Sequence, residues 1–498
     1  MPLRLPSAHA PVWVLAESIA AACFSLLSML VIGRVIGPHA AGTGTVAIAA
    51  FLIAELVVGS LFPDSLVRLA KLEQRHADSA ATAAVLFGIL GGAVVAALGP
   101  LLAREAGEPV IIWLALALAP LLPMAAFSGT ASGLYVRDQR FRLLSGRLLL
   151  GQPVALAVGL GLAWTGHGPW AMIGAQAVST LVTFLLMLRG GLGLRPRLDR
   201  AALADLWPIA LPQIAAAVVQ AGKYRLFLLA LSILVVPGVL AVAHFAFRLV
   251  DAAVAVVWQT VSRISMARLC ALQHDREALA ERYGELAELQ SMLALPICLG
   301  LGLVAPDMVA LLLGPAWAGL GEAARIVACG AALTFLYGDT HSLFVALGKA
   351  RRNLEIAAVT LALPLAALAI VRPHTAEGAA LAWVLPSLAL PPVLTILVLR
   401  EIGRSPAWLA RKVAPGVFAG LVMAAAVLLA RDNLAAPPWA TLLAEIAAGG
   451  VAWLLAAALA MRGRLPQALR TDRAPVAWRR REASRRGLRE AGAGQGPG

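Results

Sequence analysis

Charged residues are scarce in this sequence. Asp, Glu, Lys and Arg make up 14% of its 498 residues, whereas 60% are hydrophobic and the mean hydropathy is +0.83. A soluble globular protein has about 25% charged and about 45–50% apolar residues. The composition therefore excludes a soluble enzyme, a nucleic-acid-binding module and a disordered protein. Because one membrane-spanning helix needs about 20 apolar residues, the chain has room for more than a dozen spans.

Cysteines and enzyme motifs are also scarce or missing. The four cysteines are Cys23, Cys270, Cys298 and Cys329, and no two of them form a CxxC pair. This spacing supports neither a metal site nor a disulfide framework. The sequence contains no HExxH, GxSxG or P-loop lysine motif. We therefore expect no catalytic residue, no metal and no cofactor, and we expect that the protein is not an enzyme.

Apolar runs of about 20 residues predict an all-α polytopic membrane protein with about fourteen transmembrane helices. The expected spans are residues 12–36, 42–63, 80–102, 110–134, 144–165, 169–188, 206–231, 238–261, 287–313, 323–346, 354–371, 378–399, 413–430 and 439–461. The segment 262–286 has helix-forming composition with mixed charges. We expect it to form a short amphipathic helix on the inner surface.

Lys and Arg residues are distributed unevenly between the connecting segments. The connecting segments are assigned alternately to the two sides of the membrane. Of the Lys and Arg residues, 33 then lie on one side, 4 lie on the other, and 4 lie within apparent spans. The positive-inside rule then predicts cytoplasmic N- and C-termini and a multi-pass protein of the plasma membrane. This distribution also accounts for the net charge of +14 without nucleic acid. The Arg-rich residues 463–498 are predicted to be a disordered tail that associates with anionic inner-leaflet lipid.

The sequence contains an internal repeat. Residues 12–48 align without gaps with residues 211–247 at an offset of 199. Each repeat would hold six spans, an even number, so the two repeats would run parallel, as in many secondary transporters. The predicted domains are an N-terminal six-helix lobe 1–188, a basic linker 189–205, a C-terminal six-helix lobe 206–400, two further helices in 401–462, and the tail 463–498.

Three motifs carry a resemblance to a known family. They are IGRVIGPHAAGTGTVAIA at 32–49, the Gly314–Trp317 block within LLLGPAWAGLGEAARIVA, and LFVALGKARRNLEI at 343–356. With the six-plus-six-plus-two plan, they resemble the polysaccharide transporter and O-antigen flippase branch of the multidrug/oligosaccharidyl-lipid/polysaccharide exporter superfamily. The resemblance covers about residues 10–462 and implies lobes like those of MATE transporters. Family members often carry Asp-Arg in span 7, where this chain has Tyr224-Arg225.

Charged residues inside spans are candidate functional groups, because each costs roughly 2.5–3.5 kcal/mol near the centre of a membrane helix. His244, Arg248 and Asp251 have the spacing i, i+4, i+7, which places them on one helical face. One interpretation is a cationic site for an anionic head group, with Asp251 and His244 setting its charge. The alternative is an Arg248–Asp251 pair that only neutralises itself.

Other polar residues in spans are candidates to line a cavity. In span 7 they are Gln213, Gln220, Lys223 and Tyr224, and in span 1 they are Ser25 and Ser28. Glu17 and Glu55 are candidates for coupling to H⁺ or Na⁺, although Glu17 can equally cap a polar helix face or pair with a cation from another span.

The resemblance implies a flippase that moves undecaprenyl-type lipid-linked oligosaccharide across the bacterial inner membrane. Two lobes would expose a central site alternately, for the synthesis of lipopolysaccharide O-antigen or exopolysaccharide. Other polysaccharide-assembly proteins would be potential partners, and nucleic acid would not. The alternatives are a MATE-type multidrug exporter and a membrane-bound glycan-processing enzyme.

The uneven charge distribution generates a topological prediction. Reporter fusions at Arg140, Gln273 and Arg480 are expected to report a cytoplasmic location, and fusions at His167 and Ala318 an exterior one. A reversed signal at one site would show that a span upstream of that site has been miscounted.

Overall fold

The computed structural model describes residues 10–69, 71–138, 140–434 and 436–461, and its elements there are helices with short connections. The helices are α1 Ala10–Gly59, α2 Pro63–Arg68, α3 Gln74–Ala106, α4 Val110–Leu118, α5 Leu121–Arg137, α6 Phe141–Trp164, α7 Trp170–Arg189, α8 Arg200–Leu234, α9 Pro237–Ala271, α10 Arg276–Leu313, η1 Pro315–Trp317, α11 Leu320–Thr334, α12 Thr340–Ala346, α13 Ala350–Val371, α14 Ala376–Ile402, α15 Pro406–Asn433 and α16 Pro438–Ala460. Eleven helical stretches in this part are long and apolar enough to cross a membrane. The predicted all-helical, multi-pass class is confirmed, and the count of fourteen spans stays a prediction.

The long helix α1 consists of two helical segments that meet at a bend. Gly37 has φ 77° and ψ 168°, which is not helical, and Pro38 follows it. Glycine tolerates a positive φ at little cost, and proline is well suited to the first turn of a helix. The bend separates the two predicted spans 12–36 and 42–63.

Two predicted segments differ from the structure. The span 323–346 is interrupted between α11 and α12, where Asp339 caps α12 by accepting hydrogen bonds from the backbone N–H and the hydroxyl of Ser342 at 3.1 and 2.7 Å. The separate surface helix expected in 262–286 is wrong. Helix α9 continues to Ala271 and α10 begins at Arg276, so the helices themselves extend through this segment. Its mixed charges lie on those extensions.

The predicted linker runs along the N-terminal end of α3 as an extended segment. Three of its backbone N–H groups donate hydrogen bonds to side chains of α3. The pairs are Arg195 N with Asp78 Oδ1 at 3.0 Å, Arg197 N with Thr82 Oγ1 at 3.1 Å, and Asp199 N with Ser79 Oγ at 2.9 Å. Helix α8 begins at Arg200, so the last part of the predicted linker 189–205, residues 200–205, is helical.

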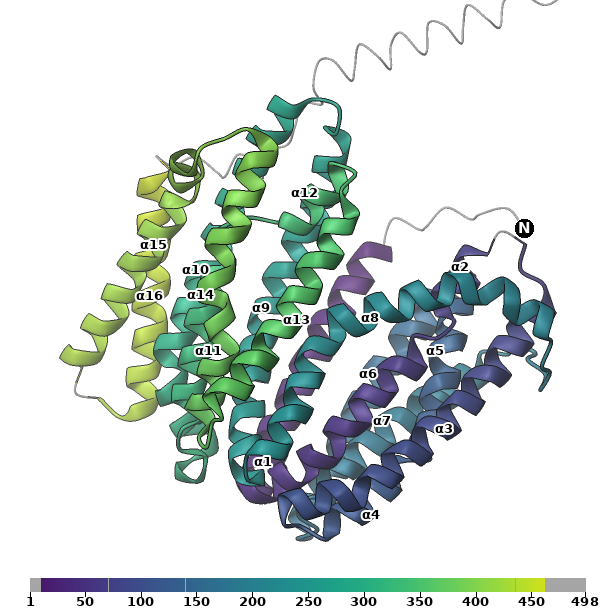
Figure 1. The fold of residues 1–498 in the computed structure, drawn as a ribbon. Helices are drawn as coiled ribbons and strands as arrows, with labels where there is room; N and C mark the ends of the chain where they lie inside the picture. Colours follow the sequence, from purple (N-terminus) through teal and green to yellow (C-terminus); the bar gives the residue numbers. More distant parts are fainter. Residues whose placement is uncertain (1–9, 70, 139, 435, 462–498) are drawn as a thin grey trace, which may run out of the picture.

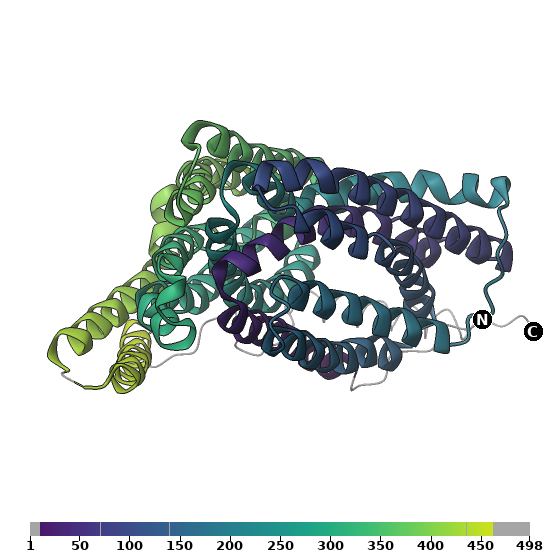
Figure 2. The same ribbon diagram turned by 90° about the horizontal axis from the view of Figure 1, so that it is seen from below.

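The helices gather in two groups, as Figures 1 and 2 show. Helices α2–α7 lie on one side and α9–α16 on the other, with α1 and α8 between them. Helix α1 packs against α9, and α8 packs against α1, α3 and α13. These contacts join the two groups.

A close approach between α1 and α9 depends on a glycine of α1. A Cβ atom at Gly42 would lie 1.6 Å from the carbonyl oxygen of Pro237, the first residue of α9. Close to this contact in the sequence, Arg34 Nη1 donates a hydrogen bond to the Leu312 carbonyl oxygen at 2.7 Å. Backbone therefore meets backbone here with no space for a side chain.

Trp317, from the Gly314–Trp317 motif, packs into the same junction. Its side chain is fully buried and stacks on Phe245 of α9, with 4.5 Å between ring centroids. A Cβ atom at Gly33 of α1 would lie 2.4 Å from Phe245 Cε2 and 3.2 Å from Trp317 Cζ2. The motif thus supplies an aromatic ring that fills the space left by a glycine.

We predict that Gly42→Ala destabilises the junction between α1 and α9. Overpacking of this kind costs about 1–3 kcal/mol, because the Pro237 backbone cannot move aside as a flexible side chain would. The apparent Tm of the detergent-solubilised protein, followed by tryptophan fluorescence, should fall by several degrees. Gly161→Ala on α6 is the matched control, since nothing lies within 4 Å of its added methyl group. Equal Tm values for the two variants would contradict the close approach.

Candidate functional site

One face of α9 carries three ionisable side chains. His244, Arg248 and Asp251 follow one another along this helix, as their spacing predicts. His244 is buried, Arg248 is half-buried and Asp251 is exposed. Asp251 interacts electrostatically with both Arg248 and Lys223 of α8. The face therefore combines a buried end with an accessible end.

Tyr224 of α8 faces His244 of α9. Tyr224 Oη and His244 Nδ1 are 2.5 Å apart and share a hydrogen bond. With the imidazole proton on Nε2, the tyrosine hydroxyl is the donor. This contact connects the two helices and places two predicted site residues side by side.

Lys223 packs on an aromatic residue that the sequence did not single out. Its Nζ lies 4.7 Å from the ring centroid of Trp383, a residue of α14. The same indole ring packs against Phe227 and Phe247, with centroid distances of 5.0 and 5.5 Å. A cation over an aromatic face is attracted by the negative potential of the ring. The ammonium is thus held against Trp383, and it interacts electrostatically with Asp251.

Arg225 connects α8 to α1. Its Nη1 donates a hydrogen bond of 2.5 Å to the Leu52 carbonyl oxygen, and its guanidinium interacts electrostatically with Glu55. It also interacts electrostatically with Arg248. Arg225 therefore links α8 with α1 through its guanidinium.

The remaining predicted residues do not all join this face. Gln213 lies beside Arg68: with its amide oxygen turned toward the guanidinium, it accepts hydrogen bonds from Nη1 and Nη2 at 2.9 and 3.2 Å. Ser28 has a buried hydroxyl oxygen with no hydrogen-bond partner among the described residues. The side chains of Gln220, Ser25 and Glu17 lie outside the part that the structure describes.

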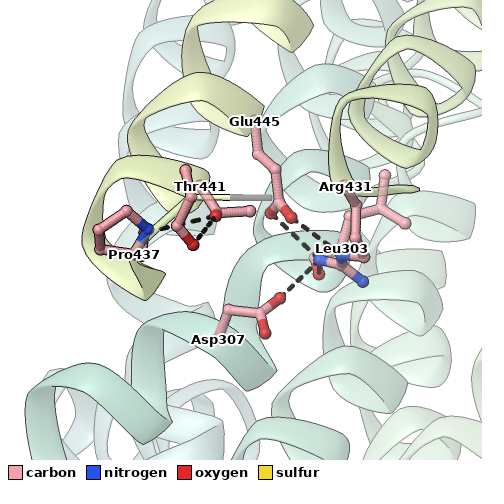
Figure 3. Close-up of polar contacts among 7 residues, drawn as sticks. Leu303, Asp307, Arg431, Pro437, Thr441 and Glu445 are labelled. Atoms are coloured by element: carbon pink, nitrogen blue, oxygen red, sulfur yellow. Dashed lines mark hydrogen bonds and ion pairs between the residues drawn. The ribbon is translucent and has the colours of Figure 1, made fainter. Parts of the chain in front are cut away.

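A second ionic cluster lies in α10, α15 and α16, away from the α8–α9 face (Figure 3). Arg431 donates hydrogen bonds to both carboxylate oxygens of Glu445 at 2.9 and 3.1 Å, to Asp307 Oδ2 at 2.7 Å, and to the Leu303 carbonyl oxygen at 2.9 Å. The Glu445 side chain is 1% exposed. Because this arginine is bonded on several sides, the cluster anchors the last two helices rather than offering a binding site.

Within the described residues, no three His, Cys, Asp or Glu side chains are grouped closely enough to hold a metal ion. The cavities in this part of the chain include two with different linings. One, of about 560 Å³, has an apolar lining from α10, α11, α14 and α15. The other, of about 230 Å³, has a largely polar lining from α1, α5, α6 and α7 and includes Glu55.

Comparison with known proteins agrees with this architecture. Residues 12–321, more than half of the chain, match the family described as polysaccharide biosynthesis protein. No curated protein sequence matches the chain.

Solved structures show the same fold. The lipid II flippase MurJ in an inward closed conformation has a TM-score of 0.76 and 11% identity, over 90% of this chain and 99% of MurJ. An inward-facing multidrug resistance MATE family transporter of the MOP superfamily has a TM-score of 0.63 and 16% identity, over 77% of this chain and 94% of its own. A MOP superfamily transporter from Pyrococcus furiosus has a TM-score of 0.51 and 16% identity, over 79% of this chain and 95% of its own. At these identities, the likeness concerns the fold.

The cluster around Arg431 generates a stability prediction. Glu445→Gln should lower the apparent Tm of the detergent-solubilised protein by several degrees, because breaking a buried ion pair costs about 3–5 kcal/mol. The remaining ion pair of Arg431 with Asp307 offsets part of this cost. Glu355→Gln is the matched control: its ion pair with Arg351 is exposed, and such pairs contribute about 0–1 kcal/mol. If both variants unfold at the wild-type temperature, the cluster does not anchor α15 and α16.

Proposed function

The chain belongs to the polysaccharide biosynthesis protein family and has the fold of MOP-superfamily transporters, and we propose that it is a flippase for lipid-linked oligosaccharide. The family and the fold are those of a transporter and not of an enzyme. In this proposal, the protein moves an undecaprenyl-type carrier with its glycan across a bacterial inner membrane, for cell-surface polysaccharide such as O-antigen or exopolysaccharide.

One observation carries the proposal: three cations lie together in the described part of the α8–α9 region. They are Lys223, Arg225 and Arg248, and their electrostatic partners there include the carboxylates of Asp251 and Glu55. Cations inside a membrane protein are costly and commonly mark the path of an anionic substrate. A phosphate or pyrophosphate group on a lipid carrier has the charge that such a site would neutralise. Guanidinium groups also donate paired hydrogen bonds that match phosphate oxygens.

The parts of the substrate would divide between different surroundings. The phosphate would bind near Arg248, the sugars would meet uncharged polar groups such as Tyr224, and the lipid tail would stay in the bilayer. The charge distribution assigns the junction of Gly42 and Arg34 to the exterior side. Contacts at that junction would then close the exterior side while the substrate enters from the cytoplasm.

The domain plan completes the proposal. Residues 1–188 and 206–400 would form two lobes that rock about the α8–α9 region, with residues 401–462 as an added helix pair. Both termini would be cytoplasmic, and the tail 463–498, which lies outside the described residues, would associate with anionic lipid. Alternating access of this kind is typical of transporters built from repeats.

A multidrug exporter is the second candidate, because a MATE transporter shares the fold. An exporter of cationic drugs needs acids to attract its substrates. Here three cations interact with the acids Asp251 and Glu55 among the described residues, and this concentration of positive charge favours an anionic substrate. A substrate that is purified with the protein and contains phosphate would therefore distinguish the flippase from the exporter.

Arg248 is the residue on which the proposal is tested. Arg248→Gln should reduce the flipping of a lipid-linked oligosaccharide in proteoliposomes at least about tenfold, because the phosphate loses a charge-assisted hydrogen bond. Arg325→Gln is the matched control, since Arg325 is also a half-buried arginine of a helix but pairs with Glu322 on its own turn. Flipping by this control should stay near the wild-type rate.

The double variant Arg248→Gln, Asp251→Asn separates the two interpretations of Arg248. If the arginine binds phosphate, removing the acid as well restores nothing, and flipping stays low. If the arginine only neutralises Asp251, the double variant recovers what the single change lost. Full activity of the double variant would therefore overturn the phosphate site.

A further inference from the structure

The polar cavity of about 230 Å³ is the feature that the charged α8–α9 face leaves unexplained. Five residues that end in hydroxyl or amide groups line it, namely Ser128, Gln176, Ser179, Thr180 and Thr183. Glu55 of α1 and Arg147 of α6 complete the polar lining. In a membrane domain, a space lined in this way is costly unless its polar groups find partners.

Several of these groups have unused hydrogen-bonding capacity. The side chains of Glu55, Ser179 and Thr183 make no hydrogen bond to other residues in the described part of the chain. Ser128 and Gln176 each donate one bond, to the Met124 carbonyl oxygen at 2.7 Å and to Thr180 Oγ1 at 3.4 Å. Acceptors and donors that point into one cavity are the arrangement expected of a ligand site.

The size and charge of the cavity define the ligand class. Because a water molecule occupies roughly 30 Å³ of liquid, a single ion would leave most of the 230 Å³ unfilled. Sites for drug-sized ligands measure about 300–1,000 Å³, so this one suits a smaller molecule, about one ring. One carboxylate and one guanidinium line it, so it has no excess charge for an ionic ligand. The dense hydroxyl and amide lining does not suit a lipid chain.

We propose that this cavity binds one uncharged sugar ring, and, resting on the function proposed above, that the ring belongs to the transported head group. The Glu55 carboxylate accepts hydrogen bonds from two neighbouring sugar hydroxyls, and Gln176, Ser179 and Thr183 bond to others.

The position of the cavity next to the charged face supports this assignment. Arg225 interacts electrostatically with Glu55 on the cavity side and with Arg248 on the α8–α9 face. A sugar at Glu55 and a phosphate at Arg248 would thus lie on opposite sides of one guanidinium. In a lipid-linked saccharide, phosphate and first sugar are directly bonded, so the two sites would hold adjacent parts of one molecule.

The experiment is a direct binding measurement that needs no transport. Isothermal titration calorimetry on the detergent-solubilised full chain would use glucose, galactose, mannose and N-acetylglucosamine, with glucuronate as the charged comparison. We expect at least one neutral sugar to bind more tightly than glucuronate. Glu55→Gln should weaken its binding about tenfold or more, and Thr183→Val and Ser179→Ala about fivefold each, the usual effects of losing charged and neutral hydrogen bonds.

Matched variants outside the cavity control for folding. Thr360→Val on α13 removes a half-buried hydroxyl, and Glu401→Gln removes a carboxylate that pairs with Lys349. Both should bind the sugar as the wild type does. Wild-type protein that binds none of these sugars, or cavity variants with unchanged affinity, would overturn the proposal. Loss of H⁺ or Na⁺ dependence of transport in Glu55→Gln, with sugar affinity unchanged, would make the cavity an ion-coupling site instead.

The two proposals fail in different ways. Wild-type protein that binds a sugar through Glu55 but does not flip lipid-linked oligosaccharide would support the cavity and overturn the flippase. Wild-type protein that flips this substrate, but whose Glu55→Gln, Thr183→Val and Ser179→Ala variants bind the sugars unchanged, would support the flippase and overturn the cavity.

Discussion

The cost of placing charge inside a membrane governs the organisation of this protein. Two of the three cations of the α8–α9 region contact another helix: Lys223 contacts Trp383 of α14, and Arg225 contacts the Leu52 carbonyl of α1. Because hydrocarbon provides no partner for these groups, the protein must supply them, and it does so across its two helical groups. The charged residues of α8 therefore also connect helices to one another. A ligand that displaces Trp383 from Lys223, or the Leu52 carbonyl from Arg225, would change how these helices are held together.

The junction between α1 and α9 complements these polar contacts with close packing. Gly42 allows backbone to meet the Pro237 carbonyl, and Gly33 leaves room for the stacked rings of Phe245 and Trp317. Small residues favour close helix contacts in membranes, where the hydrophobic effect between helices is absent. Polar contacts and close packing thus both connect α1 with its neighbouring helices.

Ionic residues in this fold differ in how completely their partners satisfy them. Arg431 is surrounded by Glu445, Asp307 and a carbonyl oxygen at 2.7–3.1 Å, and this arrangement holds helices together. Glu55 faces a cavity and makes no hydrogen bond within the described residues, while Asp251 stays exposed. Saturated charges stabilise the fold, whereas charges with remaining capacity are available to a ligand.

The sequence by itself determined the helical, multi-pass class and the face shared by His244, Arg248 and Asp251. Both are local properties, because helices satisfy their own backbone in lipid and their periodicity orients neighbouring side chains. Only the tertiary structure decided that Trp383 receives Lys223, that Arg225 reaches α1, and that Glu55 shares a cavity with residues of α5, α6 and α7. Hydropathy shows which segments are apolar but not which helices become neighbours. Contacts between residues far apart in the sequence depend on how small and large side chains pack, and the hydropathy pattern does not determine that packing.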